Sequence, residues 1–245
     1  MKLIIENISK CNICSNKLKK VASLPDYPLT EFFSNKRQIK KKFNINQKLL
    51  FCERCKHISL EKIVNQSFLY SNYKVKSKTS IKHAGEYLTN FYLFIKKNSK
   101  NFGKKAIIDI GGNDSTFLNL FKNKLKINID PNASGKKDII KEKEYFEEVN
   151  FSKYNDLKKI YVSSHTIEHI PNIKSLIKKI SLSMKINDYF FLQYPSLEMF
   201  VNNSRFDQIT HQHLNLYSLK SISRVLNKNN LFILKYEFDN SVFGT

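Results

Sequence analysis

The sequence predicts an α/β protein in which a parallel β-sheet with flanking helices follows a small cysteine-rich domain. From residue 104 onward, short β-branched apolar runs alternate with segments of helical periodicity. Strands that alternate with helices form a parallel sheet through right-handed crossovers. All four cysteines of the 245-residue chain lie before residue 56, in two pairs. This length is enough for one good-sized domain with a buried core and a second, smaller domain.

The composition indicates a folded protein and argues against two classes of function. Hydrophobic residues make up 41% of the chain, which suits a globular protein, and the longest apolar runs are too short to cross a bilayer. The N-terminal MKLIIENISKC is not a signal peptide, so we expect a cytoplasmic protein without a membrane partner. The net charge of +21 comes from lysines spread over every expected helix. Nucleic-acid partners usually meet a clustered basic face, so we do not expect one here.

The cysteines form two CxxC pairs, Cys11 with Cys14 and Cys52 with Cys55. Disulfides are not the default in a cytoplasmic protein. Two CxxC turns supply four thiolates, which is the ligand set of a closed tetrahedral zinc site. Such a site has no open coordination position, so the sequence predicts structural rather than catalytic zinc. Four unrelated buried or redox thiols are the alternative. His57 is expected beside the ligands or at the surface.

Three regions are expected along the chain. Residues 1–60 form the zinc-binding domain, residues 61–100 a helical connector, and residues 101–245 the sheet domain. Within the connector, apolar residues of 83–97 recur at helical spacing. The chain ends shortly after LFILKYEF at 231–238, which is expected to be a strand. We therefore expect the sheet domain to be incomplete at its C-terminus.

The elements of the sheet domain are expected in alternation. Buried parallel strands read as short apolar β-branched runs, whereas helices show a period near 3.6 residues. The expected strands are 104–112, 125–130, 159–165 and 188–195. The expected helices are 115–124, the charged stretch between residues 131 and 158, and 172–184.

The turn after the first of these strands, within AIIDIGGNDSTFL at 106–118, predicts a ligand loop. Small residues let a ligand approach the backbone closely, and a following helix start would offer free N–H groups. Asp130 ends the next strand, where an acidic group can accept hydrogen bonds from both hydroxyls of a ribose. The loop lacks the GxGxxG spacing of dinucleotide-binding folds, so S-adenosylmethionine is favoured over NAD. An ordinary βα turn is the alternative.

The order of motifs along the chain resembles that of a known family. CNIC, CERC, YSNYKVKSKTS, IIDIGGNDSTFL, NIDP, SSHTIEHIPN and FDQITHQHLNLYS follow one another from Cys11 onward. In this order they resemble the sugar C-methyltransferases that depend on S-adenosylmethionine, carry an N-terminal zinc-binding domain and have the Rossmann-like sheet of class I methyltransferases. Those enzymes act on keto deoxysugars attached to a nucleotide diphosphate. The resemblance implies a nucleotide-sugar substrate, S-adenosylmethionine as cofactor and structural zinc.

The resemblance also assigns roles to individual residues. It makes the four cysteines zinc ligands and residues 61–100 a lid over the substrate. The cofactor set is Asp109, Gly111, Gly112, Asn113 and Asp114, with Asp130 at the ribose; the substrate set is Tyr70 and Tyr73; the catalytic set is His169, His211, Gln212 and His213. Ordinary polar residues before a helix are the alternative for the last three. Glu168 is expected either to contact the cofactor or to cap the next helix.

Three positions depart from the family pattern. Ser115 replaces the last glycine of GSNDG, which is tolerable if that residue has ordinary helical angles, and Val75 replaces the second tyrosine of a Tyr-x-Tyr pair. Gln212 replaces a glutamate and cannot take a proton. If carbon is methylated, His213 or His211 must therefore act as the base. An O- or N-methyltransferase, a zinc-containing nucleic-acid-binding protein and a non-catalytic relative stay open as alternatives.

Overall fold

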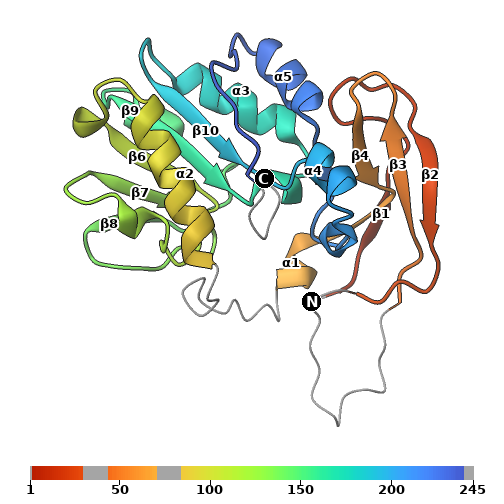
Figure 1. Cartoon of the computed structure of the whole chain (residues 1–245). Coiled ribbons are helices and arrows are strands. Elements are labelled where there is room, and N and C mark those ends of the chain that lie inside the picture. Colours follow the sequence, from red (N-terminus) through yellow and green to blue (C-terminus); the bar gives the residue numbers. More distant parts are fainter. Residues whose placement is uncertain (1, 30–43, 71–83, 240–245) are drawn as a thin grey trace. The chain divides into compact units, whose positions relative to one another are not determined.

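The structure is a computed structural model that describes residues 2–29, 44–70 and 84–239 (Figure 1). The chain divides into two compact units, and each combines segments that are distant in sequence. Unit 1 comprises Met1–Val75, Glu168–Ile173 and Pro195–Val225, and unit 2 comprises Lys76–Ile167, Lys174–Tyr194 and Leu226–Thr245. Within the described ranges, no helix combines the length and apolar character needed to cross a bilayer.

Unit 2 contains the predicted parallel sheet, which confirms the α/β fold. Its strands are β6 (Ala106–Ile110), β7 (Lys126–Ile129), β8 (Ile139–Glu142), β9 (Lys159–Ser164) and β10 (Tyr189–Gln193). The spatial order is β10-β9-β6-β7-β8 (Figure 1), and all neighbouring pairs are parallel. The chain runs outward from β6 to β8 and then crosses back to β9. This reversal beside β6 is a topological switch point, where open α/β sheets bind ligands at the carboxyl ends of their strands.

Helix α2 (Ala84–Asn98) supplies one side of the core of unit 2. Its apolar positions Tyr87, Leu88, Phe91 and Ile95 are buried in one cluster with Ile107 of β6. These positions recur every three or four residues, so they form a single face of the helix. The predicted helices at 83–97 and 172–184 are confirmed as α2 and α3 (Ile173–Ser183).

Three expected elements were wrong. Residues 115–124 form turns and a short 3-10 helix, η4 (Leu118–Leu120), because Ser115 has a left-handed φ of 61° that an α-helix excludes. Residues 131–158 contain β8 and a 3-10 helix, η5 (Phe151–Tyr154), because Ile139 pairs with β7. The described part of 231–239 has no regular secondary structure, and Leu234 is 81% exposed.

Unit 1 is built around a four-stranded antiparallel sheet in the order β11-β4-β3-β2. These strands are β2 (Lys19–Leu24), β3 (Gln47–Cys52), β4 (His57–Leu60) and β11 (Asn215–Leu216); β1 (Ile5–Asn7) pairs separately with β5 (Lys62–Val64). The short helices are α1 (Gln66–Tyr70), α4 (Leu197–Asn202), η7 (Phe206–Gln208) and α5 (Leu219–Asn227), with η6 (Ile167–His169) and η3 (Phe102–Lys104) elsewhere in the chain. The late strand β11 pairs with β4, Asn215 opposite Ser59. Residues 195–225, which we expected within 101–245, therefore belong to unit 1.

Candidate functional site

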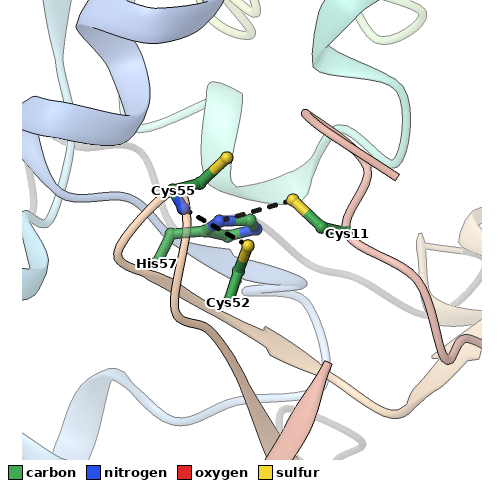
Figure 2. A group of neighbouring side chains, drawn as sticks. All are labelled: Cys11, Cys52, Cys55 and His57. Carbon is green, nitrogen blue, oxygen red and sulfur yellow. Dashed lines mark hydrogen bonds between the residues drawn. The ribbon is translucent and has the colours of Figure 1, made fainter. Parts of the chain in front are cut away.

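The cysteines converge around His57 in unit 1 (Figure 2). The ligand atoms of Cys11, Cys52, Cys55 and His57 all lie within 4.8 Å of one another, and all four residues are buried. The fourth cysteine is close by, because Cys14 Sγ lies 3.6 Å from Cys52 Sγ. Each CxxC turn directs amide groups at its first sulfur, as when the Cys55 N–H donates to Cys52 Sγ at 3.3 Å. The buried group alone thus supplies the four donors that zinc needs, and the Cys14 thiol lies beside it.

The acidity of these thiols is set by burial and by their hydrogen bonds. Burial raises the pKa of Cys11 to about 11 and also raises the pKa of Cys55. Burial acts in the same direction on Cys14, but hydrogen bonds from the Asn16 N–H and the other thiols lower the pKa of Cys14 to about 7. A cation among the sulfurs would favour the thiolate form of all of them.

His57 is held in one orientation by a chain of hydrogen bonds. The Ser59 hydroxyl donates to Asn215 Oδ1 at 3.0 Å, so at the 3.1 Å contact between His57 Nε2 and Ser59 Oγ the ring nitrogen is the donor. The lone pair of the neutral ring is then on Nδ1, which faces Cys11 Sγ at 4.0 Å (Figure 2). Burial lowers the pKa of His57 to about 4, which keeps the ring neutral. His57 is fully buried next to the sulfurs, so of the two expected positions the one beside the ligands is correct and the surface position is wrong. Its tautomer is that of a metal ligand.

The loop after β6 in unit 2 has space only for glycine at two positions. Gly111 has a φ of 79°, and a Cβ there would lie 2.2 Å from Thr166 Oγ1. A Cβ on Gly112 would lie 2.5 Å from Asn128 Oδ1 and 2.9 Å from Asp109 Oδ2. Asp109 is itself 2% exposed. The absence of side chains leaves backbone that a ligand can approach closely, as expected of a cofactor loop.

Asp130 is connected to this loop directly. Its Oδ2 accepts a hydrogen bond from the Asn113 N–H at 3.2 Å, and its Oδ1 accepts one from the Asn132 N–H at 2.7 Å. Asp114 Oδ1 accepts a bond from the Thr116 N–H at 2.9 Å, which closes the turn. The structure therefore brings the predicted loop residues and Asp130 together at the carboxyl ends of β6 and β7.

Ser115 and Asn128 hold the loop in shape. The left-handed φ of Ser115 costs a non-glycine residue roughly 1–2 kcal/mol, so the expectation of ordinary helical angles was wrong. Its buried hydroxyl donates to the Ser134 carbonyl and accepts from Asn128 Nδ2 at 2.8 Å. Asn128 Nδ2 also donates to the Asn113 carbonyl at 2.9 Å. Sequence reasoning missed Asn128, although a polar residue inside the strand KINI was a signal.

The second group of predicted residues lies in unit 1. His169 Nδ1 lies 2.9 Å from the Gln212 carbonyl and His213 Nδ1 lies 2.8 Å from the Gln208 carbonyl. Because carbonyls only accept hydrogen bonds, each Nδ1 carries a proton. The two rings meet edge to face with centroids 4.9 Å apart. Glu168, which is 1% exposed, has Oε1 3.9 Å from His169 Nε2.

His211 differs from its neighbours because it lies in the interior of unit 1. It is fully buried and stacks on Tyr27 with ring centroids 5.0 Å apart. Burial lowers the pKa of His211 to about 4, so the ring is neutral near pH 7. The Tyr27 hydroxyl donates to the Ile209 carbonyl, which holds the stack against the loop.

The two tyrosines assigned to the substrate are not positioned as side chains. Tyr73 and Val75 lie outside the described residues, and Tyr70 is described only as the last residue of α1. The cofactor loop belongs to unit 2, and the histidine group belongs to unit 1.

The profile of the methyltransferase domain family matches residues 82–236, more than half of the chain, and the chain belongs to this family. The chain is 21% identical over 201 residues to the C-methyltransferase NovU of Streptomyces niveus, an alignment that covers 76% of this chain and 46% of NovU. The chain thus spans about half the length of that relative. The chain is also similar to a crystal structure from Listeria monocytogenes that is provisionally assigned as an S-adenosylmethionine-dependent methyltransferase. The sequence identity is 18%, and the match covers 41% of this chain and 50% of that chain. The TM-score of 0.31 is too low to support an argument.

Proposed function

We propose that this enzyme transfers a methyl group to a sugar, one linked to a nucleotide, in deoxysugar or polysaccharide biosynthesis. The observation that carries the proposal is the pair of imidazoles His169 and His213, whose Nδ1 protons are both held by backbone carbonyls. The motif order and the similarity to NovU over 76% of the chain support a carbon acceptor. O- or N-methylation of a related acceptor is the second candidate, because Gln212 stands where a carboxylate base is expected.

His213 is the proposed base. Its Nδ1 proton is directed at the Gln208 carbonyl, so the neutral ring carries its lone pair on Nε2. That atom would take the proton of the carbon next to the acceptor's ketone, or of a hydroxyl or amine, so that the acceptor becomes the nucleophile. His169 would orient the acceptor. Gln212 would position His169 through its carbonyl, and His211 would act through packing, since it is fully buried.

The residues around Gly111 and Gly112 fit the cofactor. Asp109, Asn113 and Asp114 would line its methionine and adenosine end, and Asp130 would bind the ribose. The glycine positions leave a cradle that any Cβ would fill. S-adenosylmethionine, when bound, supplies an electrophilic methyl group.

The cysteine cluster is proposed to hold one structural zinc ion. Cys11, Cys52 and Cys55 are common to both possible ligand sets. In the four-thiolate set the fourth ligand is Cys14. In the other set, which we call the buried set, the fourth ligand is His57. The buried set is favoured by the geometry, because His57 directs the Nδ1 lone pair toward the sulfurs.

Calorimetric titration with S-adenosylmethionine and S-adenosylhomocysteine tests the cofactor assignment. Hydrogen bonds to a charged group are worth about 1.5–3 kcal/mol, so Asp130→Ala should weaken binding by about 10- to 100-fold. Asp156→Ala is the matched control, because this carboxylate is fully exposed and lies 3.9 Å from Lys185. Equal affinity in Asp130→Ala and Asp156→Ala would contradict the ribose assignment.

A further inference from the structure

We propose that Glu168, His169 and His213 form a binding site for a divalent transition-metal ion, separate from the cysteine cluster. All three residues belong to unit 1. The inference uses only the geometry of this unit, and it holds whether or not the proposed sugar substrate is correct.

The distances match the size of a metal site. One ligand atom from each of the three residues lies within 4.8 Å of the other two, and Glu168 Oε1 lies 3.9 Å from His169 Nε2. Zinc binds nitrogen and oxygen ligands at about 2.0–2.2 Å, so two ligands of one ion are at most about 4.4 Å apart. The carboxylate and the first imidazole already satisfy this limit. The second imidazole has to move by a few tenths of an ångström at most.

Both imidazoles are in the tautomer that a metal requires. His169 and His213 each direct the Nδ1 proton at a backbone carbonyl, so each neutral ring carries its lone pair on Nε2. Histidines that bind metals almost always donate their other ring N–H to a carbonyl, a carboxylate or water. Both carbonyls come from one loop, because the acceptors are Gln208 and Gln212. The fold thus fixes the same tautomer on both rings before any ion arrives.

Glu168 provides the oxygen ligand of the proposed site. The residue is 1% exposed, and carboxylate oxygens are common ligands of divalent ions alongside imidazole nitrogens. It precedes His169 in η6 (Ile167–His169), so the two ligands come from adjacent positions of one turn. His213 approaches from the loop before β11. A divalent ion would neutralise the carboxylate and accept both nitrogen lone pairs.

The donor set selects the class of ion. Two imidazoles and one carboxylate suit Zn²⁺, Co²⁺, Ni²⁺ or Fe²⁺, whereas Mg²⁺ and Ca²⁺ prefer oxygen ligands alone. Three protein ligands leave at least one coordination position for water or for an oxygen of the acceptor. A bound ion would engage Nε2 of His213, the atom that the proposed function uses as the base. Occupancy of the site should therefore inhibit methyl transfer if His213 is the base.

The test uses the full chain after its cysteine cluster has been filled with zinc and the free metal has been removed. Metal analysis verifies the zinc content. Co²⁺ is then titrated and followed by calorimetry and by visible absorption. We expect one further ion per chain without the intense thiolate charge-transfer bands that cobalt shows in cysteine sites. Glu168→Gln and His213→Gln should each weaken this binding by at least about tenfold, since even the loss of a group that only hydrogen-bonds to a metal ligand costs 10- to 100-fold in affinity. His165→Asn is the control, because it removes an imidazole of unit 2 at a φ of 49° that asparagine tolerates.

Circular dichroism establishes whether each variant is folded. If Glu168→Gln, at a buried position, fails to fold, His213→Gln still tests the site, because His213 is partly exposed. No additional cobalt on the folded wild-type chain would overturn the proposal. Undiminished cobalt binding in His213→Gln would overturn it as well. Assays of methyl transfer separate this inference from the proposed function. Cobalt binding together with metal-dependent activity would support the site while removing His213 from the role of base.

Discussion

Replacing Gly111 with alanine should destabilise unit 2 by about 2–5 kcal/mol. The φ of Gly111 is 79°, and a left-handed conformation costs a non-glycine residue roughly 1–2 kcal/mol. The added Cβ would also lie 2.2 Å from Thr166 Oγ1 and 2.4 Å from Thr166 Cγ2. Forcing a methyl group into a packed site typically costs about 1–3 kcal/mol. The total is a large fraction of the roughly 5–15 kcal/mol that stabilises a typical domain.

Urea unfolding followed by circular dichroism measures this change against a matched glycine variant. Gly85 lies in α2, and a Cβ there would meet nothing within 4 Å, so Gly85→Ala should stabilise the protein by about 0.5–1 kcal/mol. Combining Gly111→Ala with Thr166→Ala separates the two contributions. Removing Oγ1 and Cγ2 should recover part of the steric cost, while the backbone cost remains.

The reasoning is refuted if Gly111→Ala and Gly85→Ala differ by less than about 0.5 kcal/mol, the usual range of surface substitutions. A double variant no more stable than Gly111→Ala would show that Thr166 is not the group that the methyl meets. Because the same loop is assigned to the cofactor, the affinity for S-adenosylmethionine should fall in Gly111→Ala and stay unchanged in Gly85→Ala.

Three further predictions concern the loop, the base and the metal cluster. Ser115→Ala keeps the left-handed backbone but loses two hydrogen bonds, so it should lower the free energy of unfolding by about 1–3 kcal/mol. Ser115→Gly should be more stable than Ser115→Ala, because glycine adopts the left-handed backbone without strain. Calorimetric melting of both variants decides the order. His213→Ala should reduce turnover by about 10²- to 10⁴-fold, the usual range for a general base, with unchanged cofactor affinity, and surviving activity would exclude it as the base. Metal analysis should find zinc retained in Cys14→Ser and lost in His57→Ala; the opposite result would favour the four-thiolate set.

Much of the sheet could be predicted because its signals are local. Strands β6, β7, β9 and β10 read as short apolar runs, and α2 shows its buried face at helical spacing. The segment 115–124 was misread for the opposite reason. Its apolar spacing resembles a helix, but the left-handed φ of Ser115 depends on contacts with Asn128 and Ser134, which lie on other segments.

The candidate sites divide in the same way. The CxxC pairs and the glycine loop with Asp130 were identified from residue type and spacing, and the histidine group was identified from the family resemblance. The role of His57 as a ligand could not be identified in this way. The ring nitrogen that faces the sulfurs is set by hydrogen bonds to Ser59 and, through it, to Asn215 from the far end of the chain. Glu168 was equally ambiguous, and only the folded chain places it within 4.8 Å of two imidazole ligand atoms.

The sequence by itself determined the fold class, the cysteine and glycine motifs and the methyltransferase resemblance, because periodicity and motif spacing act between residues close in the chain. The tertiary structure alone decided which segments form each unit and which ring nitrogen of each histidine carries the proton. Pairing of β11 with β4 joins residues 195–225 to the N-terminal sheet. The paired residues Ser59 and Asn215 are 156 positions apart in the sequence, a separation at which local patterns carry no information.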